Sequence, residues 1–127
     1  MVALDTNVAI ALLRGKTQLL LDAGVRIEDC ALPVVVAGEL LFGAQNSGRP
    51  AENLVAYRSF ILDMQPLLLD ALAAEHYAKI RLALKQKGRP IPENDMWIAA
   101  ICRAHDAPLL TFDQHFAEVP DLTLIPL

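Results

Sequence analysis

The chain has 127 residues, of which 54% are hydrophobic, and its formal net charge is -4 at pH 7. The length suits one domain with its own core, so we expect a single domain over residues 1–127. The acidic balance argues against a broad basic surface for nucleic acid, although metal ions could still neutralise a local cluster of acids. No apolar run approaches the roughly 20 residues of a membrane span and no secretory signal pattern is present, so we expect a cytoplasmic protein.

A carboxylate follows the first apolar run of the chain. Val2–Leu4 is predicted to form a strand, and Asn7–Leu13 the helix that comes directly after it. Asp5 then lies where a strand ends and a helix begins, and in an open α/β sheet this edge is where ligands bind. Alternatively, Asp5 is only the N-cap of the helix, because aspartate accepts hydrogen bonds from the free N–H groups of a first turn.

The most apolar segment of the chain contains a single acid. After a short predicted helix at Thr17–Ala23 and a second strand at Ala31–Leu32, Pro33 opens a helix over Val34–Ala44. This helix is apolar on every side except at Glu39, which is typical of a buried helix. An unpaired carboxylate would be costly there, so we expect a cation beside Glu39. That cation is either a metal ion shared with other acids or an arginine or lysine side chain.

The middle of the chain carries a run of basic residues. Pro50–Met64 is predicted to be a helix and Leu67–Leu69 a third strand. Asp70 then caps a helix over Ala71–Lys87, whose lysines and arginines fall outside its apolar stripe. Such a run is either a solvated helix face or a surface that contacts a phosphate backbone.

A third acid precedes another apolar helix, predicted to begin at Met96 and to continue through Cys102. Either Asn94 or Asp95 could be the N-cap of this helix. If Asn94 is the cap, Asp95 lies in the first turn and faces whatever the helix buries. The helix dipole favours an ionised acid at that position, as a metal ligand requires.

A fourth acid repeats the arrangement at the start of the chain. Pro108–Thr111 is predicted to be a strand, and Asp113 follows its carboxyl end. Asp113 is either a site residue or a turn residue before a short helix at Gln114–Ala117. Leu122–Ile125 is predicted to be the final strand.

These acids can meet at one place. In a chain of alternating strands and helices, the carboxyl ends of parallel strands lie at the same edge of the sheet. We therefore expect Asp5, Asp95 and Asp113 to converge there, with Glu39 reaching in from its helix. Sets of oxygen ligands suit Mg²⁺ or Mn²⁺, and such ions can generate a nucleophile from water and stabilise charge on a phosphate.

Four segments that carry these acids resemble the acidic motifs of PIN-domain ribonucleases, and more narrowly those of VapC-type toxins of toxin–antitoxin pairs. The segments are LDTNVAI with Asp5, PVVVAGELLFGA with Glu39, NDMWIAA with Asp95 and LLTFDQHF with Asp113. The resemblance implies a three-layer α/β/α domain with a central parallel sheet of about five strands. It also implies that the four acids coordinate one or two Mg²⁺ or Mn²⁺ ions, supported by Thr6 and Thr111.

The same resemblance implies an endoribonuclease toxin, a VapB-type antitoxin as partner and a homodimer. Basic residues that could guide the RNA are Arg14, Lys16, Lys79, Arg81, Lys85, Lys87 and Arg89. Two other hypotheses are a PIN-like module that binds RNA or protein without catalysis, and a metal-dependent phosphohydrolase of small substrates. A pure binding module would not need a buried Glu39, so we favour the enzyme.

Overall fold

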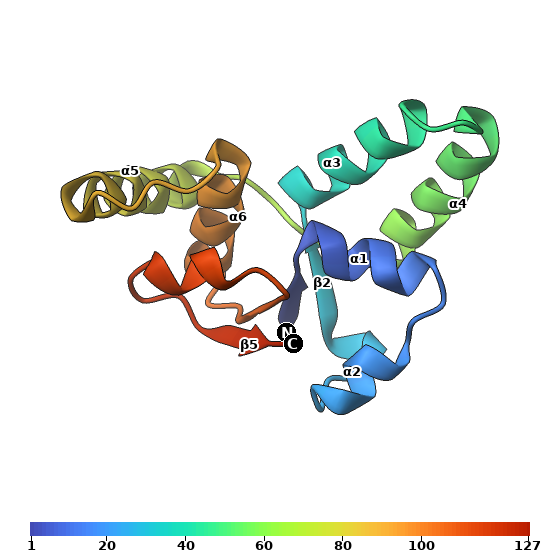
Figure 1. Ribbon diagram of the computed structural model, residues 1–127, viewed down its shortest axis with the longest axis horizontal. Helices are drawn as coiled ribbons and strands as arrows, with labels where there is room; N and C mark the ends of the chain where they lie inside the picture. Colours follow the sequence, from blue (N-terminus) through green and yellow to red (C-terminus); the bar gives the residue numbers. More distant parts are fainter.

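The computed structural model describes residues 1–127 as a parallel five-stranded sheet covered by helices on both faces. The strand order is β3-β2-β1-β4-β5, and each neighbouring pair is parallel. In Figure 1, α5 and α6 lie on one side of the sheet, and α1, α3 and α4 lie on the other. The predicted three-layer α/β/α arrangement is confirmed.

The elements are β1 (Val2–Leu4), α1 (Thr6–Leu13), α2 (Gln18–Asp22), η1 (Ile27–Asp29), β2 (Cys30–Pro33), α3 (Val34–Gln45), α4 (Pro50–Asp63), β3 (Gln65–Leu67), α5 (Ala71–Lys87), α6 (Glu93–Ala104), β4 (Leu109–Thr111), η2 (Gln114–Glu118) and β5 (Leu124–Pro126).

The direction of winding reverses at β1, and in open α/β sheets such a reversal is where ligands bind. From β1 the chain moves outward to β2 and β3, then crosses back through α5 and α6 to β4 on the other side of β1. Leu4 pairs with Leu110, and the amide of Asp5 donates to the carbonyl of Leu110. The residues that follow β1 and β4 are therefore neighbours at the point where the strand order switches.

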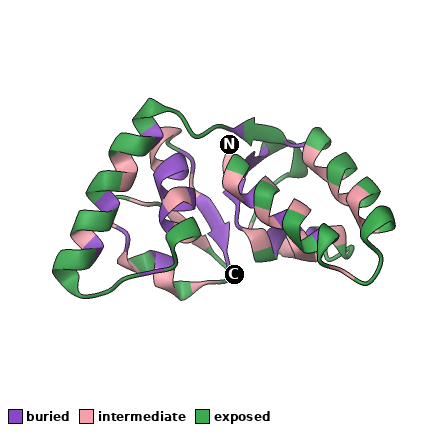
Figure 2. Cartoon of the chain, turned by 90° about the horizontal axis from the view of Figure 1, so that it is seen from above, coloured by how far each residue is buried: buried purple, intermediate pink, exposed green.

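The core lies on both faces of the three central strands. Strands β2 and β4 are buried along their whole length, and Figure 2 shows this buried centre between helices that are exposed on their outer sides. Phe116, Leu110 and Ile98 are among the largest fully buried side chains. Such a doubly covered sheet accounts for the high hydrophobic fraction of the sequence.

Two of the predicted strands have different bounds in the structure. The third strand is Gln65–Leu67 instead of Leu67–Leu69, and the last is Leu124–Pro126 instead of Leu122–Ile125. Both are edge strands, where proline is tolerated because one side of the strand needs no N–H donor. No helix has the length and apolar character required to cross a membrane.

Candidate functional site

Asp5 lies at the junction of β1 and α1 and has two roles. It occupies the N-cap of α1, and its Oδ1 accepts a hydrogen bond from the amide of Thr6 at 2.8 Å. Its Oδ2 accepts a second hydrogen bond, from the hydroxyl of Thr111 at 2.8 Å. Only 3% of Asp5 is exposed, and burial raises its pKa to about 6 despite these two bonds. The cap function proposed as an alternative is therefore present, but it engages only one of the two oxygens.

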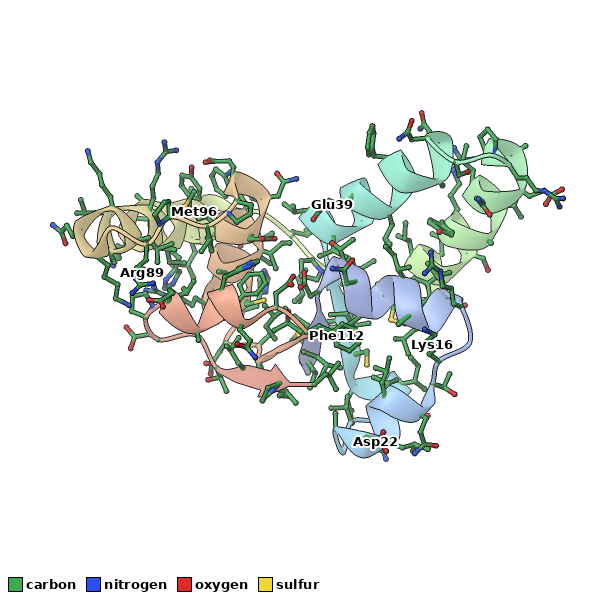
Figure 3. The ribbon with its side chains drawn as sticks, viewed as in Figure 1. Lys16, Asp22, Glu39, Arg89, Met96 and Phe112 are labelled. Carbon is green, nitrogen blue, oxygen red and sulfur yellow. The ribbon has the colours of Figure 1, made fainter.

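Glu39 reaches the same edge from α3. Its Oε1 accepts a hydrogen bond from the hydroxyl of Thr6 at 3.0 Å, and no arginine or lysine forms an ion pair with it. Partial burial raises its pKa, and the nearby charge of Asp95 raises it further. In Figure 3, Glu39 lies at the end of α3 that faces α6.

The prediction that α3 is buried on all sides is wrong. Val36, Leu40 and Ala44 are buried, but Phe42 is 69% exposed on the other side of the helix. Glu39 itself is only half-buried. Burial within this chain therefore does not explain why the outer face of α3 is apolar.

Asp95 lies in the first turn of α6, but neither it nor Asn94 is the N-cap. The helix begins at Glu93, and Pro92 occupies the cap position without a side-chain hydrogen bond. Burial raises the pKa of Asp95, and the charge of Asp113 acts in the same direction, whereas the contact with His115 lowers it. Asp95 is therefore free of a capping role.

His115 belongs to this site and was not predicted. Its Nε2 lies 2.8 Å from Oδ2 of Asp95, and η2 holds the imidazole in place directly after β4. The only signal in the sequence is its position two residues beyond Asp113, which does not indicate a partner on another helix.

Asp113 and Thr111 complete the arrangement at the end of β4. The hydroxyl of Thr111, which is 3% exposed, accepts a hydrogen bond from the amide of Asp113 at 2.9 Å while it donates to Asp5. Asp113 precedes η2 and makes no side-chain cap. The two threonines thus fix two carboxylates, Thr111 holding Asp5 and Thr6 holding Glu39.

All four predicted acids line one cleft of about 540 Å³ at the carboxyl edge of the sheet. The cleft has no hydrophobic lining residue. Its nine lining residues are Asp5, Thr6, Asn7, Glu39, Pro92, Glu93, Asn94, Asp95 and Asp113. Four of them were not predicted as site residues: Asn7, Pro92, Glu93 and Asn94.

The chemistry of this cleft fits a hard divalent cation. Its donors are carboxylate, amide and hydroxyl oxygens, and no lysine or arginine pairs with the four acids. As the side chains stand, no three acidic, histidine or cysteine groups lie close enough together to enclose an ion. The carboxylates are turned toward Thr6, Thr111 and His115 instead. Mg²⁺ typically binds through one or two carboxylates and keeps several waters, so it does not require a closed cage of side chains.

The basic residues proposed for RNA contact lie outside the cleft and are spread over the molecule. Figure 3 shows Lys16 and Arg89 on opposite sides. Arg81 is 3.5 Å from Glu93, and Lys87 is 3.7 Å from Glu118, so two of the seven are held in exposed ion pairs.

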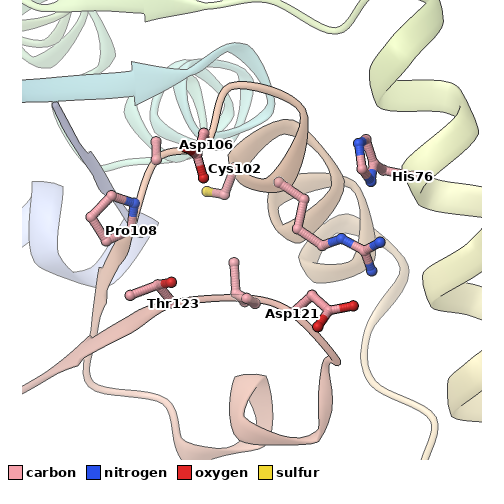
Figure 4. A pocket seen from close by; sticks show the side chains of 9 residues that line it. His76, Cys102, Asp106, Pro108, Asp121 and Thr123 are labelled. Carbon is pink, nitrogen blue, oxygen red and sulfur yellow. The ribbon is translucent and has the colours of Figure 1, made fainter.

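A second cavity, of about 290 Å³, lies at the amino ends of β4 and β5. Figure 4 shows His76 and Cys102 on one side of it and Asp121 and Thr123 on the other. The Nδ1 of His76 is buried without a hydrogen-bond partner. None of the predicted site residues lines this cavity, so the acidic cleft is the candidate site. Fold and cleft together define a doubly wound α/β protein with an acidic site made of oxygen donors.

Comparisons with known proteins identify the family. The PIN domain model matches residues 2–122. Ribonuclease VapC5 of Mycobacterium tuberculosis (strain ATCC 25618 / H37Rv) is 35% identical over 117 residues, which are 90% of this chain and 84% of that protein. The tRNA(fMet)-specific endonuclease VapC of Shigella flexneri is 30% identical over 85% of this chain and 83% of its own. The chain therefore belongs to the PIN-domain family, in its VapC branch.

Solved structures agree with this assignment. A VapBC2 chain from Rickettsia felis, crystallised with a DNA fragment of the promoter, superposes with a TM-score of 0.86 and 26% identity over 100% of this chain and 99% of that one. A VapBC-1 chain from nontypeable Haemophilus influenzae gives a TM-score of 0.87 and 26% identity over 99% and 98% of the two chains.

Proposed function

We propose that this protein is an endoribonuclease that hydrolyses RNA phosphodiesters with the help of Mg²⁺ or Mn²⁺, and that it is the toxin of a toxin–antitoxin pair. The observation that carries the proposal is the gathering of Asp5, Glu39, Asp95 and Asp113 in one cleft without a lysine or arginine partner. Repulsion between these acids is relieved if cations come from solution. The relatives named as ribonucleases support RNA as the substrate.

The four acids would hold one or two ions, each through carboxylate oxygens and water. When bound, the ions lower the pKa of a water molecule and stabilise negative charge on the scissile phosphate. Asp5 is the anchor of this arrangement, because Thr6 and Thr111 fix both of its oxygens. The side chain cannot rotate without losing two hydrogen bonds.

Two other acids are oriented by groups of the protein. Thr6 holds Glu39, and His115 holds Asp95 in the first turn of α6. Because the pKa values of Asp5, Glu39 and Asp95 are raised, protons compete with metal ions for the cleft as the pH falls.

The proposed partners are a VapB-type antitoxin and a second copy of the chain. Large exposed apolar side chains on α3 and α4 support this part of the proposal. Phe42 is 69% exposed, Val55 71% and Leu62 84%. Apolar side chains that collect on the surface of a small protein mark interaction surfaces.

RNA cleavage by purified protein, freed of antitoxin, tests the proposed activity. The Shigella flexneri relative is named for its action on tRNA(fMet), so this RNA is the first substrate to try. We expect cleavage in MgCl₂ or MnCl₂ and none in EDTA or in the Asp5→Asn variant. Equal cleavage with and without EDTA would overturn the metal dependence, and undiminished cleavage by Asp5→Asn would overturn the role of the cleft.

A further inference from the structure

We propose that a hollow beside the acidic cleft binds the phosphates of single-stranded RNA next to the cleavage position, and that the neighbouring pair of stacked aromatic rings receives an unpaired base. We call this hollow the α5 hollow. It is lined by Arg81, Leu84, Lys85, Gly88, Pro90 and Met96. The inference rests on the proposed ribonuclease function and specifies where the RNA strand lies.

The α5 hollow has room for a phosphate group and carries two basic side chains. Its volume is about 320 Å³, and no acidic residue lines it. Arg81 and Lys85 are one helical turn apart on α5, so they project from the same face of the helix. Lys85 has no ion-pair partner, and its charge is therefore available to a ligand.

The hollow and the cleft share a wall. Glu93 lines the cleft, and its Oε1 and Oε2 both lie 3.5 Å from Nη1 of Arg81, which lines the hollow. Pro92 lines the cleft, and Pro90, two residues earlier in the same loop, lines the hollow. A strand that places one phosphate among the acids therefore has its neighbouring phosphates beside two cations.

A stacked pair of aromatic rings lies beside this wall. The rings of Tyr77 and Trp97 are 3.7 Å apart at their centroids and within 7° of parallel. The hydroxyl of Tyr77 donates to Glu93 and accepts from Nη1 of Arg81 at 2.7 Å. Both rings are only half-buried. An aromatic surface next to cations is how proteins bind single strands, whose unpaired bases stack on the rings while the cations follow the backbone.

The aromatic pair favours RNA over an acidic protein segment as the ligand, because unpaired bases stack on aromatic rings. The acids of the cleft repel the flanking phosphates of any RNA bound there, so productive binding requires compensating cations on the path of the strand. Arg81 and Lys85 are the two basic residues that line the hollow; Lys85 is unpaired, whereas Arg81 is paired with Glu93. The proposed contact Lys87 is paired with Glu118 and does not line the hollow. Of the seven basic residues proposed for RNA contact, we therefore retain Arg81 and Lys85.

Trp97 is the only tryptophan in the chain, so its fluorescence reports on this place alone. We would titrate the Asp5→Asn protein, which we expect to leave RNA uncut, with a single-stranded oligouridylate about ten nucleotides long, a length within the usual range of single-strand sites. We expect saturable quenching of Trp97. Adding Arg81→Ala and Lys85→Ala should raise Kd about tenfold, and the salt dependence of log K should fall by about 0.7 for each lost phosphate contact.

Arg58→Ala in the same Asp5→Asn background is the matched control. Arg58 is an exposed helical arginine on α4, on the other side of the sheet, so Kd should not change. Circular dichroism checks that each variant is folded. Absence of quenching, or an equal Kd for the Arg81/Lys85 variant, would overturn the inference. If that variant binds the oligouridylate normally but retains less antitoxin, the hollow is a protein surface and the inference is also wrong.

The two proposals fail in different ways. If the wild-type protein cleaves RNA in Mg²⁺ while the Arg81/Lys85 variant cleaves and binds RNA equally well, the nuclease function stands and the α5 hollow is excluded. If the wild-type protein cleaves no RNA, the proposed function itself is wrong, whatever the fluorescence shows.

Discussion

The imidazole of His115 contacts the carboxylate of Asp95 through a bond of 2.8 Å that joins η2 to the first turn of α6. The side chain of Asp95 is 17% exposed and that of His115 is 35% exposed. The histidine is therefore the more exposed member of the pair, and it orients an acid that lines the cleft.

We predict that His115→Ala weakens metal binding or activity by about 10- to 100-fold, as is usual when a group that orients a ligand is removed. The measurement is the rate of RNA cleavage as a function of Mg²⁺ concentration. A positioning role predicts that more Mg²⁺ is needed for half-maximal rate, and that His115→Gln, which can still donate a hydrogen bond, recovers part of the loss. An unchanged Mg²⁺ dependence would contradict this role.

Asp5→Asn should abolish RNA cleavage and growth inhibition while leaving the fold intact. The asparagine side chain keeps an oxygen that can accept from the backbone amide of Thr6, but it lacks the negative charge needed to hold a cation. Cleavage assays and far-UV circular dichroism check the two parts. Asp63→Asn is the control, because Asp63 is an exposed acid at the end of α4 and its loss should leave cleavage unchanged.

The metal-free protein should lose stability as the pH rises through the titration of Asp5. The pKa of Asp5 is raised by burial from 3.8 to about 6, so the folded state binds the proton more tightly than the unfolded state does. Protonated Asp5 contributes about 3 kcal/mol to the free energy of unfolding. This contribution is complete below about pH 4 and is lost as the pH rises past about 6.

Urea unfolding of wild type and Asp5→Asn at a series of pH values between these limits would measure this effect. The difference in the free energy of unfolding between the two proteins reports on Asp5. Glu39 and Asp95, whose pKa values are also raised, are present in both proteins. A difference that stays constant over this range would contradict the predicted titration.

Thr111→Val should destabilise the protein at neutral pH. Valine has nearly the same shape, but it removes the hydroxyl that donates to Asp5 and accepts from the amide of Asp113. Both groups would lose a partner in a buried place, which costs about 1–3 kcal/mol for each unsatisfied group. Thr123→Val, remote from the cleft and directly before β5, is the control for the threonine-to-valine substitution itself. Equal stabilities of the two variants in urea would contradict the prediction.

Divalent ions should raise the melting temperature. A ligand that binds only the folded state stabilises it by about 2.7 kcal/mol at 100 times its Kd. Mg²⁺ or Mn²⁺ added to the wild-type protein at neutral pH should raise Tm, EDTA should reverse the change, and Glu39→Gln should reduce it. An identical rise in Glu39→Gln would mean that Glu39 does not contribute to holding the ion.

The fold and most of the cleft could be predicted because they depend on local patterns. Asp5 and Asp113 follow apolar strands, and a parallel sheet brings the carboxyl ends of its strands to one edge. Asp95 lies in the first turn of an apolar helix and Glu39 in the middle of another. Asp70 was likewise predictable as the cap of α5, and it accepts a hydrogen bond from the amide of Ala73.

Features that depend on tertiary contacts could not be predicted in this way. Phe42 lies on a helix that is apolar all round, and the pattern gives no means of telling a face covered by the core from one left open. His115 acquires its role from Asp95, which is 20 residues away on another helix. The boundaries of β3 depend on its pairing with β2 at the edge of the sheet, not on its run of leucines.

The pairing of β1 with β4 also determines when the cleft can form. Thr111 and Asp5 are 106 residues apart in the chain, although their strands are neighbours in the sheet. During translation, β1 emerges from the ribosome before β4 and can pair with it only after the intervening residues have been made. A nascent chain that has not yet delivered β4 lacks Thr111, Asp113 and His115, so the cell is not exposed to a finished cleft until synthesis has passed that strand.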